Sequence, residues 1–306
     1  MRPLVIGTRA SSLAVCQANL VRARLEERFP GREFRLQTIR VEADRKPDAP
    51  LAQIRGEGIF VKELEAALTA RSIDLAVHSL KDMPLQIPAG LCLVAVLKRD
   101  EPRDAMITRS GKRLTELPSG ARIGTSSLRR QSQLRRLRSD LELLDIRGNV
   151  DTRLRKLDEG HYDALVVAAC GLIRLGLERR ITELLESSVM SPEPGQGALA
   201  VEARTDDAET CGAVAFLDHA VSRACVEVER AFLGALGGGC RLPIAAYASA
   251  DGEMLNLQGA VIAPNGSDER RGTLSGSITE PVALGERLAR DLESQGAREL
   301  LARKAG

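Results

Sequence analysis

Three short polar segments of this chain could bind anions, because each follows an expected strand and opens an expected helix. They are Arg9-Ala10-Ser11-Ser12, Thr125-Ser126-Ser127-Leu128-Arg129-Arg130 and Arg147-Gly148-Asn149. The first turn of a helix offers unpaired backbone N–H groups and the positive end of the helix dipole, so anions bind there. Serine and threonine also cap helices when no ligand is present, so simple helix capping remains an alternative.

A carboxylate follows another expected strand, at residues 73–77. Asp82 lies in the segment His78-Ser79-Leu80-Lys81-Asp82-Met83-Pro84. A carboxylate at that place could act as a general acid or base, or could stabilise a cationic intermediate. The alternative is a structural salt bridge with the neighbouring Lys81.

One cysteine has surroundings that favour reactivity. Cys240 follows three glycines and precedes Arg241. Glycine lets the backbone approach a ligand closely, and a neighbouring cation lowers the pKa of a thiol. The alternative is a buried structural cysteine in a tight turn.

The remaining cysteines and the histidines predict no metal site. The six cysteines contain no Cys-x-x-Cys pair, and His78, His161 and His219 are scattered without the spacing of ligands. We therefore expect these three histidines to be structural or solvated.

The charge pattern favours a small anionic partner over nucleic acid. The formal net charge is only +2, aromatic residues make up 2% of the chain, and tryptophan is absent, so little is available to stack on bases. Residues 122–156 nevertheless hold ten basic and four acidic residues. We expect an anion to meet that region, although a solvated helix face would give the same pattern.

No apolar run is long enough to cross a bilayer, which predicts no membrane partner. The chain enters an expected strand at residues 4–8 without a segment typical of a signal peptide. We therefore expect a cytoplasmic protein.

Strands and helices are expected to alternate through the first two thirds of the chain. The expected strands cover 4–8, 34–41, 73–77, 91–97, 121–124, 141–146 and 163–169. This alternation predicts mostly parallel sheets with helices on both faces. The aperiodic segment 42–57 is long for a connection and is interpreted as a functional flap.

The pattern changes after Pro192-Glu193-Pro194-Gly195-Gln196-Gly197, which is typical of a hinge. A helix is expected over 222–235 and another over 280–303. Between them, Asp251-Gly252 and Asn265-Gly266 predict the turns of a three-stranded antiparallel meander. The last part of the chain is therefore expected to be a small α+β unit.

Several longer strings resemble the porphobilinogen deaminase (hydroxymethylbilane synthase) family, in the family's order. They are Ile6-Gly7-Thr8-Arg9, Val77-His78-Ser79-Leu80-Lys81-Asp82, Gly124-Thr125-Ser126-Ser127-Leu128-Arg129-Arg130-Gln131, Arg147-Gly148-Asn149-Val150-Asp151-Thr152-Arg153, Pro194-Gly195-Gln196-Gly197-Ala198-Leu199 and Gly238-Gly239-Cys240. The resemblance extends from residue 6 to Cys240, and its motifs are long and specific.

The resemblance implies a transferase of porphyrin (haem) biosynthesis. Enzymes of this family join four porphobilinogen molecules head to tail, with release of ammonia, into the linear tetrapyrrole hydroxymethylbilane. They prime the chain on a dipyrromethane cofactor that is attached to a cysteine as a thioether. Cys240 matches that cysteine, and Asp82 matches the catalytic aspartate, which assists the loss of ammonia and stabilises positively charged intermediates.

Two further sets of residues match binding positions of the family. Expected to hold the cofactor are Lys81, Thr125, Ser127, Arg129 and Arg130. Expected to hold the substrate and the growing chain are Arg9, Ser11, Arg147, Asn149, Arg153 and Arg174. Since every pyrrole carries an acetate and a propionate, fixed arginines and helix N-termini suit such a ligand without a metal.

The implied fold has two hinged, doubly wound α/β domains, similar to periplasmic binding proteins, and a small C-terminal α+β domain. The expected boundaries are 1–97 with 198–215 for domain 1, which contains the flap 42–58; 98–197 for domain 2; and 216–306 for domain 3, which presents Cys240. The family is usually monomeric, so we expect a monomer.

Three positions depart from the common pattern of the family. Glu57 replaces a flap lysine, Gly237 replaces a glutamate before the Gly-Gly-Cys, and Arg241 replaces a smaller or neutral residue. We expect altered flap closure or cofactor-loop flexibility rather than lost activity. A binding protein of the same fold remains an alternative, and it would need neither Asp82 nor Cys240.

Overall fold

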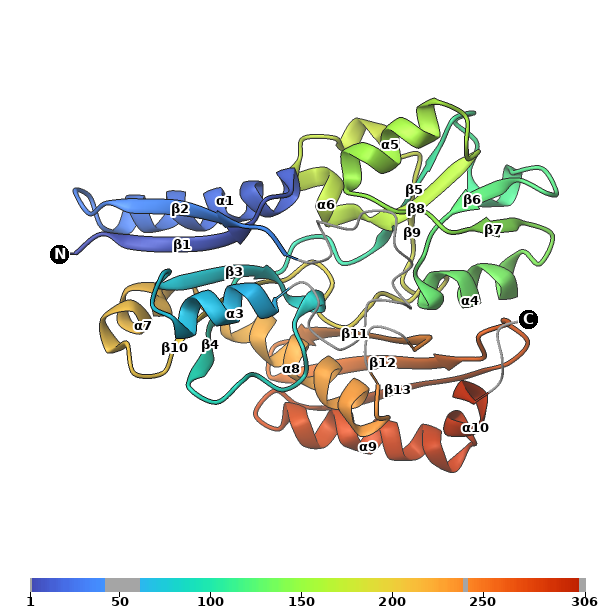
Figure 1. Cartoon of the computed structure of the whole chain (residues 1–306). Helices are drawn as coiled ribbons and strands as arrows, with labels where there is room; N and C mark the ends of the chain where they lie inside the picture. Colours follow the sequence, from blue (N-terminus) through green and yellow to red (C-terminus); the bar gives the residue numbers. More distant parts are fainter. Residues whose placement is uncertain (1, 42–60, 239–241, 303–306) are drawn as a thin grey trace. The chain divides into compact units, whose positions relative to one another are not determined.

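The computed structural model describes residues 2–41, 61–238 and 242–302. The chain divides into two compact units, of which the first combines Met1–Arg99 with Ala198–Arg223. The second combines Asp100–Gly197 with Ala224–Gly306. Each unit is described by itself, with the element labels of Figure 1.

The first unit is built on a five-stranded sheet with the order β2-β1-β3-β10-β4. Its strands are β1 (Leu4–Arg9), β2 (Phe34–Ile39), β3 (Leu75–Ser79), β4 (Leu91–Val96) and β10 (Leu199–Arg204). Strand β1 is parallel to β2 and β3, whereas β10 is antiparallel to both of its neighbours. The late strand β10 therefore completes a sheet that begins at residue 4.

Helices cover both faces of this sheet. Val77 of β3 packs in one core cluster with Val21 of α1 (Ser12–Arg28). The preceding Ala76 faces the other way and packs with Leu64 of α3 (Lys62–Thr69). Alternate residues of a strand point to opposite faces, so one apolar run supplies both cores. The short helix α7 (Ala208–Val214) adds Ala213 and Val214 to the α1 side.

The second unit repeats this strand pattern in the order β7-β6-β8-β5-β9. Its strands are β5 (Asp104–Thr108), β6 (Arg122–Gly124), β7 (Glu142–Leu144), β8 (Ala164–Ala168) and β9 (Glu183–Leu185). Strand β6 is parallel to β7 and β8, and β5 is antiparallel to β8 and β9. Helices α4 (Leu128–Leu137) and α5 (Val150–Asp158) each add leucines to a different core cluster.

The rest of the second unit is an antiparallel meander of β11 (Ile244–Asp251), β12 (Met254–Ile262) and β13 (Glu269–Ser277). It packs against α8 (Ala220–Ala235) and α9 (Pro281–Ser294) through a core that includes Phe232 and Leu288. The turn before β13 contacts α4, because Ser132 Oγ donates a hydrogen bond to the carbonyl of Pro264 at 3.2 Å.

The predicted fold class is confirmed, namely two α/β sheets and a small C-terminal unit with a three-stranded antiparallel sheet. The predicted single helix over 280–303 is wrong. It ends at Ser294 and resumes as α10 (Ala297–Leu301), because Gly296 adopts φ 86°, a left-handed conformation that interrupts a helix. The sequence analysis did not identify β5 or β9. The predicted domain boundaries stay predictions.

Candidate active site

In the first unit, the candidate residues lie at the edge of the sheet where β1 and β3 end. Arg9 is the last residue of β1, and Asp82 lies in the 3-10 turn η2 (Leu80–Asp82) directly after β3. Since β1 and β3 are parallel neighbours, their carboxyl ends meet at one edge. In open α/β sheets, ligands bind at this edge.

The loop after β1 is held by the cap of the following helix. The side chain of Ser11 accepts a hydrogen bond from the backbone N–H of Ala14 at 3.3 Å and so caps α1. Ser11 is buried, and this contact matches the capping alternative of the sequence analysis.

Asp82 lines a small hollow of about 20 Å³ together with other polar side chains. The polar residues around it are Arg9, Gln17, His78, Ser79 and Asp82. Gln17 of α1 donates a hydrogen bond to Ser79 Oγ at 3.0 Å, which fixes the wall between α1 and β3. The structure therefore brings the predicted Arg9 and Asp82 to one place, with His78 beside them.

In the second unit, two of the predicted anion-binding loops are tied to each other at the carboxyl ends of β6 and β7. Ser126 Oγ donates to the carbonyl of Ile146 at 2.8 Å and accepts from the Ile146 N–H at 3.0 Å. The side chain of Ser127 caps α4 by accepting from the N–H of Arg130, and Thr125 is buried. The predicted residues of these loops therefore belong to one sheet edge.

The predicted cofactor arginines are anchored by a buried aspartate. Arg129 donates from Nη1 to Asp104 Oδ2 at 2.8 Å, and Arg130 donates from Nη2 to Asp104 Oδ1 at 2.8 Å. Asp104 is fully buried at the start of β5. Burial acts to raise the pKa of Asp104, but the two guanidinium groups outweigh it and hold that pKa well below its usual range.

Arg129 retains donors that no described residue accepts. Its side chain is only 3% exposed, yet Nε and Nη2 are buried and have no hydrogen-bond partner within the described residues. Buried donors without partners are costly, so a carboxylate ligand would suit them. The donor set of Arg129 therefore fits the carboxylates of a dipyrromethane.

The loop after β7 presents a second set of polar groups. Gly148 adopts φ 103°, a conformation that favours glycine, and a Cβ at this position would come within 2.8 Å of Thr152. Arg153 donates from Nε to the carbonyl of Gly148 at 2.7 Å, which fixes the loop against the start of α5.

Arg147 and Asn149 leave their side chains available. Neither side chain donates a hydrogen bond to a residue that the structure describes, and Asn149 precedes α5 without capping it through its side chain. Burial lowers the pKa of Arg147, and Asp145 only partly opposes this effect. The positive charge of the half-buried Arg147 guanidinium is only partly compensated, so an anionic ligand would stabilise its charged form.

The contacts of Arg174 are with residues outside these loops. Its side chain is 5% exposed, and it donates from Nη2 to the carbonyl of Gly197 at 2.6 Å and pairs with Asp100. Gln196, in the predicted hinge, donates to Asp104 Oδ1 at 2.9 Å. The predicted hinge segment and Asp104, which anchors Arg129 and Arg130, therefore belong to one hydrogen-bonded network within the second unit.

Some predictions fall outside the described residues. These are Cys240, Arg241, Glu57 and the flap 42–58. Gly237 is described and has φ 67° after α8, a conformation that a glutamate adopts only at a cost.

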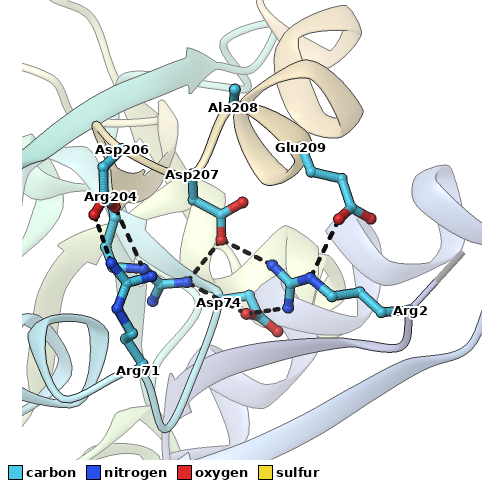
Figure 2. Close-up of a pocket in the computed structure, with 8 residues that line it drawn as sticks. All are labelled: Arg2, Arg71, Asp74, Arg204, Asp206, Asp207, Ala208 and Glu209. Carbon is cyan, nitrogen blue, oxygen red and sulfur yellow. Dashed lines mark hydrogen bonds and ion pairs between the residues drawn. The ribbon is translucent and has the colours of Figure 1, made fainter.

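A second hollow, drawn in Figure 2, is lined by residues that precede β1 and β3, namely Arg2 and Asp74. It has a volume of about 470 Å³, and its three arginines pair with carboxylates of the same lining. Arg2 bonds to Asp74 at 2.6 Å and to Asp207 at 2.8 Å, and Arg204 bonds to Asp207 at 2.7 Å. These ion pairs tie the start of the chain to α7, so the arrangement is structural.

Asp104, which positions both of the predicted cofactor arginines, was not predicted from the sequence. A lone carboxylate at the head of the apolar run Ala105-Met106-Ile107 was the available signal, because a buried charge requires a partner. His78 was expected to be structural or solvated, and it is buried and lines the same hollow as Asp82.

The described residues show neither a cluster of metal ligands nor a membrane-spanning helix. Within 2–41, 61–238 and 242–302, no group of three or more His, Cys, Asp or Glu side chains is arranged to hold a metal ion. In the same part of the chain, no helix combines the length and apolar character needed to cross a membrane.

Comparison with known proteins gives a consistent result along the chain. Residues 4–212 match the family model "Porphobilinogen deaminase, dipyromethane cofactor binding domain", and residues 223–294 match "Porphobilinogen deaminase, C-terminal domain". A porphobilinogen deaminase of Roseiflexus sp. (strain RS-1) is 50% identical over 299 residues, which cover 98% of each chain. One of Pelobacter propionicus is 48% identical and covers 98% of this chain and 96% of its own.

The chain is also similar to some solved structures at low sequence identity. A nutrient binding protein from Burkholderia cenocepacia, solved with bound methionine, has 14% sequence identity and a TM-score of 0.43. The match covers 69% of this chain and 89% of that chain.

Proposed function

Because the chain belongs to the porphobilinogen deaminase family, its reaction is the deaminative joining of porphobilinogen into a linear tetrapyrrole, and we propose that Asp82 is the catalytic residue of that reaction. The proposal is supported by the position of Asp82 beside Arg9 in the hollow at the carboxyl edge of the first sheet. A carboxylate there favours a developing positive charge and receives a proton at its oxygen.

The anchoring residue that we propose for the dipyrromethane is Cys240, which lies outside the described residues, so this assignment depends on its motif. When bound, the group supplies the pyrrole carbon to which the first substrate adds. A thiolate beside Arg241 would form the thioether more readily than an ordinary thiol.

Two sets of residues are proposed to hold carboxylates. In the second unit these are Thr125, Ser127, Arg129, Arg130, Arg147, Asn149, Arg153 and Arg174, and in the first unit they are Arg9, Ser11 and Lys81. The unpartnered donors of Arg129 carry this part of the proposal. Since Asp104 fixes both guanidinium planes, little ordering entropy is lost when a carboxylate binds.

The intact mass of the denatured protein, measured beside that of Cys240→Ser, tests the cofactor and its anchor. We expect an excess of two porphobilinogen units less two ammonia molecules, absent from the variant. If the wild-type mass is bare, incubation with porphobilinogen and a second weighing decide the result. A protein that gains no adduct would contradict the enzyme proposal and would favour a binding protein of the same fold.

We also propose that the protein is a cytoplasmic monomer that binds no nucleic acid. The low net charge and the scarcity of aromatic residues support the last point. Sedimentation of the purified protein at several concentrations, with and without DNA, tests the oligomeric state and the nucleic-acid prediction together.

A further inference from the structure

A buried group of titratable side chains lies directly behind the hollow that contains Asp82. His78 of β3 is 4% exposed, and its Nε2 lies 3.0 Å from Oε2 of Glu202 on β10. Glu202 is fully buried. In the antiparallel pairing, Ala200 lies opposite His78 and Glu202 lies opposite Ala76, so His78 and Glu202 share the face covered by α3.

The short contact fixes the form of the neutral imidazole. A carboxylate only accepts hydrogen bonds, so Nε2 must carry the hydrogen that Glu202 accepts. The neutral ring then has its lone pair on Nδ1. Nδ1 has no hydrogen-bond partner among the described residues, and His78 is part of the wall of the hollow.

A third carboxylate-bearing residue adjoins this pair. Glu65 of α3 and Glu202 each have a buried Oε1 without a hydrogen-bond partner in the described part of the chain. Burial raises the pKa of Glu65, and the charge of Glu202 raises it further, while His78 and Lys62 oppose both effects. The charged groups that surround His78 are therefore Glu65 from α3, Glu202 from β10, and Asp82 and Arg9 at the hollow.

We propose that His78, oriented by Glu202, accepts at Nδ1 the proton that Asp82 receives in each condensation. This inference rests on the proposed role of Asp82. In each condensation one C–C bond forms, the C–N bond to the departing ammonia breaks, and one ring hydrogen leaves as a proton while its electron pair returns to the ring. Asp82 takes this proton at its carboxylate oxygen and passes it to His78 Nδ1.

Asp82 and His78 line the same hollow. A hollow of about 20 Å³ has room for one water molecule, so a proton could move between Asp82 and His78 through that single water molecule. The resulting imidazolium is stabilised by the Glu202 carboxylate across 3.0 Å. The proton then leaves to the released ammonia, and His78 returns to its neutral form. In this account Glu202 is a positioning residue, and it touches no substrate.

The first test is spectroscopic and does not depend on turnover. The chain has only three histidines, so ¹⁵N-histidine spectra of the holoenzyme resolve each ring. We expect the Nε2–H form at His78 in the wild type, and loss of this preference in Glu202→Gln. A wild-type spectrum with the Nδ1–H form, or one that Glu202→Gln leaves unchanged, would overturn the proposal.

The second test is kinetic and uses variants of similar shape. We expect His78→Gln and Glu202→Gln each to lower kcat by at least about tenfold, with KM changed less than about threefold. The matched control is His161→Gln, because His161 is exposed in the second unit and should be silent. Unfolding curves identify any variant that fails to fold, and in that case the other variant decides the result.

The outcomes distinguish this inference from the proposed function. If Asp82→Asn is inactive while His78→Gln and Glu202→Gln keep the wild-type kcat, the assignment of His78 as the proton acceptor is wrong. The proposed role of Asp82 stands in that case. If Asp82→Asn keeps full turnover, the catalytic role of Asp82 is wrong, and the proton route from it falls as well.

Discussion

Arg130 donates two hydrogen bonds to a single oxygen of Asp104, from Nε at 3.1 Å and from Nη2 at 2.8 Å. The other oxygen of the same carboxylate accepts from Arg129. One buried charge on β5 thus sets the positions of two consecutive guanidinium groups at the start of α4. Two of the proposed binding arginines of the second unit are therefore placed by a residue that need not touch the ligand.

We expect Asp104→Asn to lower the free energy of unfolding by about 3–5 kcal/mol, because two buried guanidinium groups lose the carboxylate that pairs with both of them. Urea unfolding measures the change. The control is Asp140→Asn, which removes a carboxylate from an exposed pair with Arg138 and should have little effect. Equal stability of the two variants would contradict the proposed anchoring of Arg129 and Arg130 by Asp104.

We expect Asp82→Asn to reduce turnover by about 100-fold or more, because an amide neither takes a proton nor balances a positive charge. The intact mass should still show the cofactor, and the unfolding curve should be unchanged. Asp158→Asn is the control, since Asp158 pairs with Arg180 at the exposed end of α5. Wild-type turnover in Asp82→Asn would remove this residue from the mechanism.

We expect Arg147→Ala to raise the KM for porphobilinogen by about 10- to 100-fold, the equivalent of losing a charge-assisted hydrogen bond of about 1.5–3 kcal/mol. The reason is that Arg147 is half-buried and donates no hydrogen bond to a described residue. Arg155→Ala on α5, the helix that follows this loop, is the control, because Arg155 is exposed and pairs with Glu159. A similar KM in both variants would contradict a binding role for Arg147.

Asp207 should make the first unit sensitive to acid. Burial acts to raise its pKa, but hydrogen bonds from Thr210 and the charges of Arg204 and Arg2 lower it to about 2, from an ordinary value of 3.8. A carboxylate with a depressed pKa contributes stability above its unfolded pKa, and this contribution is lost as the pH falls through the folded pKa. We therefore expect a loss of stability between about pH 4 and pH 2 that Asp207→Asn reduces.

Thermal unfolding at a series of pH values, from 7 down to 2, measures this effect. The wild type should lose more stability over the acid range than Asp207→Asn does, although the variant starts less stable at neutral pH. Parallel curves for the two proteins would show that Asp207 is not responsible.

The thiol of Cys92 should react slowly. Burial and the neighbouring Cys211 thiol raise the pKa of Cys92 to about 11. Since the thiolate is the nucleophile, we expect alkylation at pH 8 to be at least about 100-fold slower than for an ordinary free thiol. Peptide mapping after timed exposure to iodoacetamide measures the rate. In Cys211→Ser the reaction at Cys92 should be faster, and an unchanged rate would contradict the coupling.

The sequence predicted the parts of the fold that depend on local patterns. Strand β1, the cap at Ser11, the start of α4 after Ser127 and the two hairpin turns of the meander all follow from spacing and residue type. The carboxyl-edge loops were found for the same reason, because each lies between an expected strand and an expected helix.

The rest depends on partners that are far apart in the chain. In the five residues of strand β5, apolar and polar side chains do not alternate regularly. The place of β5 between β8 and β9 is set by its backbone pairing with these two strands. The helix break at Gly296 depends on the backbone conformation of one glycine. Likewise, Glu202 contacts His78 across 124 residues of sequence, a relation that no local pattern encodes.

The position of β10 has a consequence for synthesis on the ribosome. This strand separates β3 from β4 in the sheet, yet it ends only at Arg204. As the chain emerges, β4 therefore has no strand to pair with until the whole second sheet, which ends with β9 at Leu185, has been translated. The second unit's sheet is in this sense ready before the first, and the unpaired edges of β3 and β4 are exposed to other nascent chains until residue 204 leaves the exit tunnel.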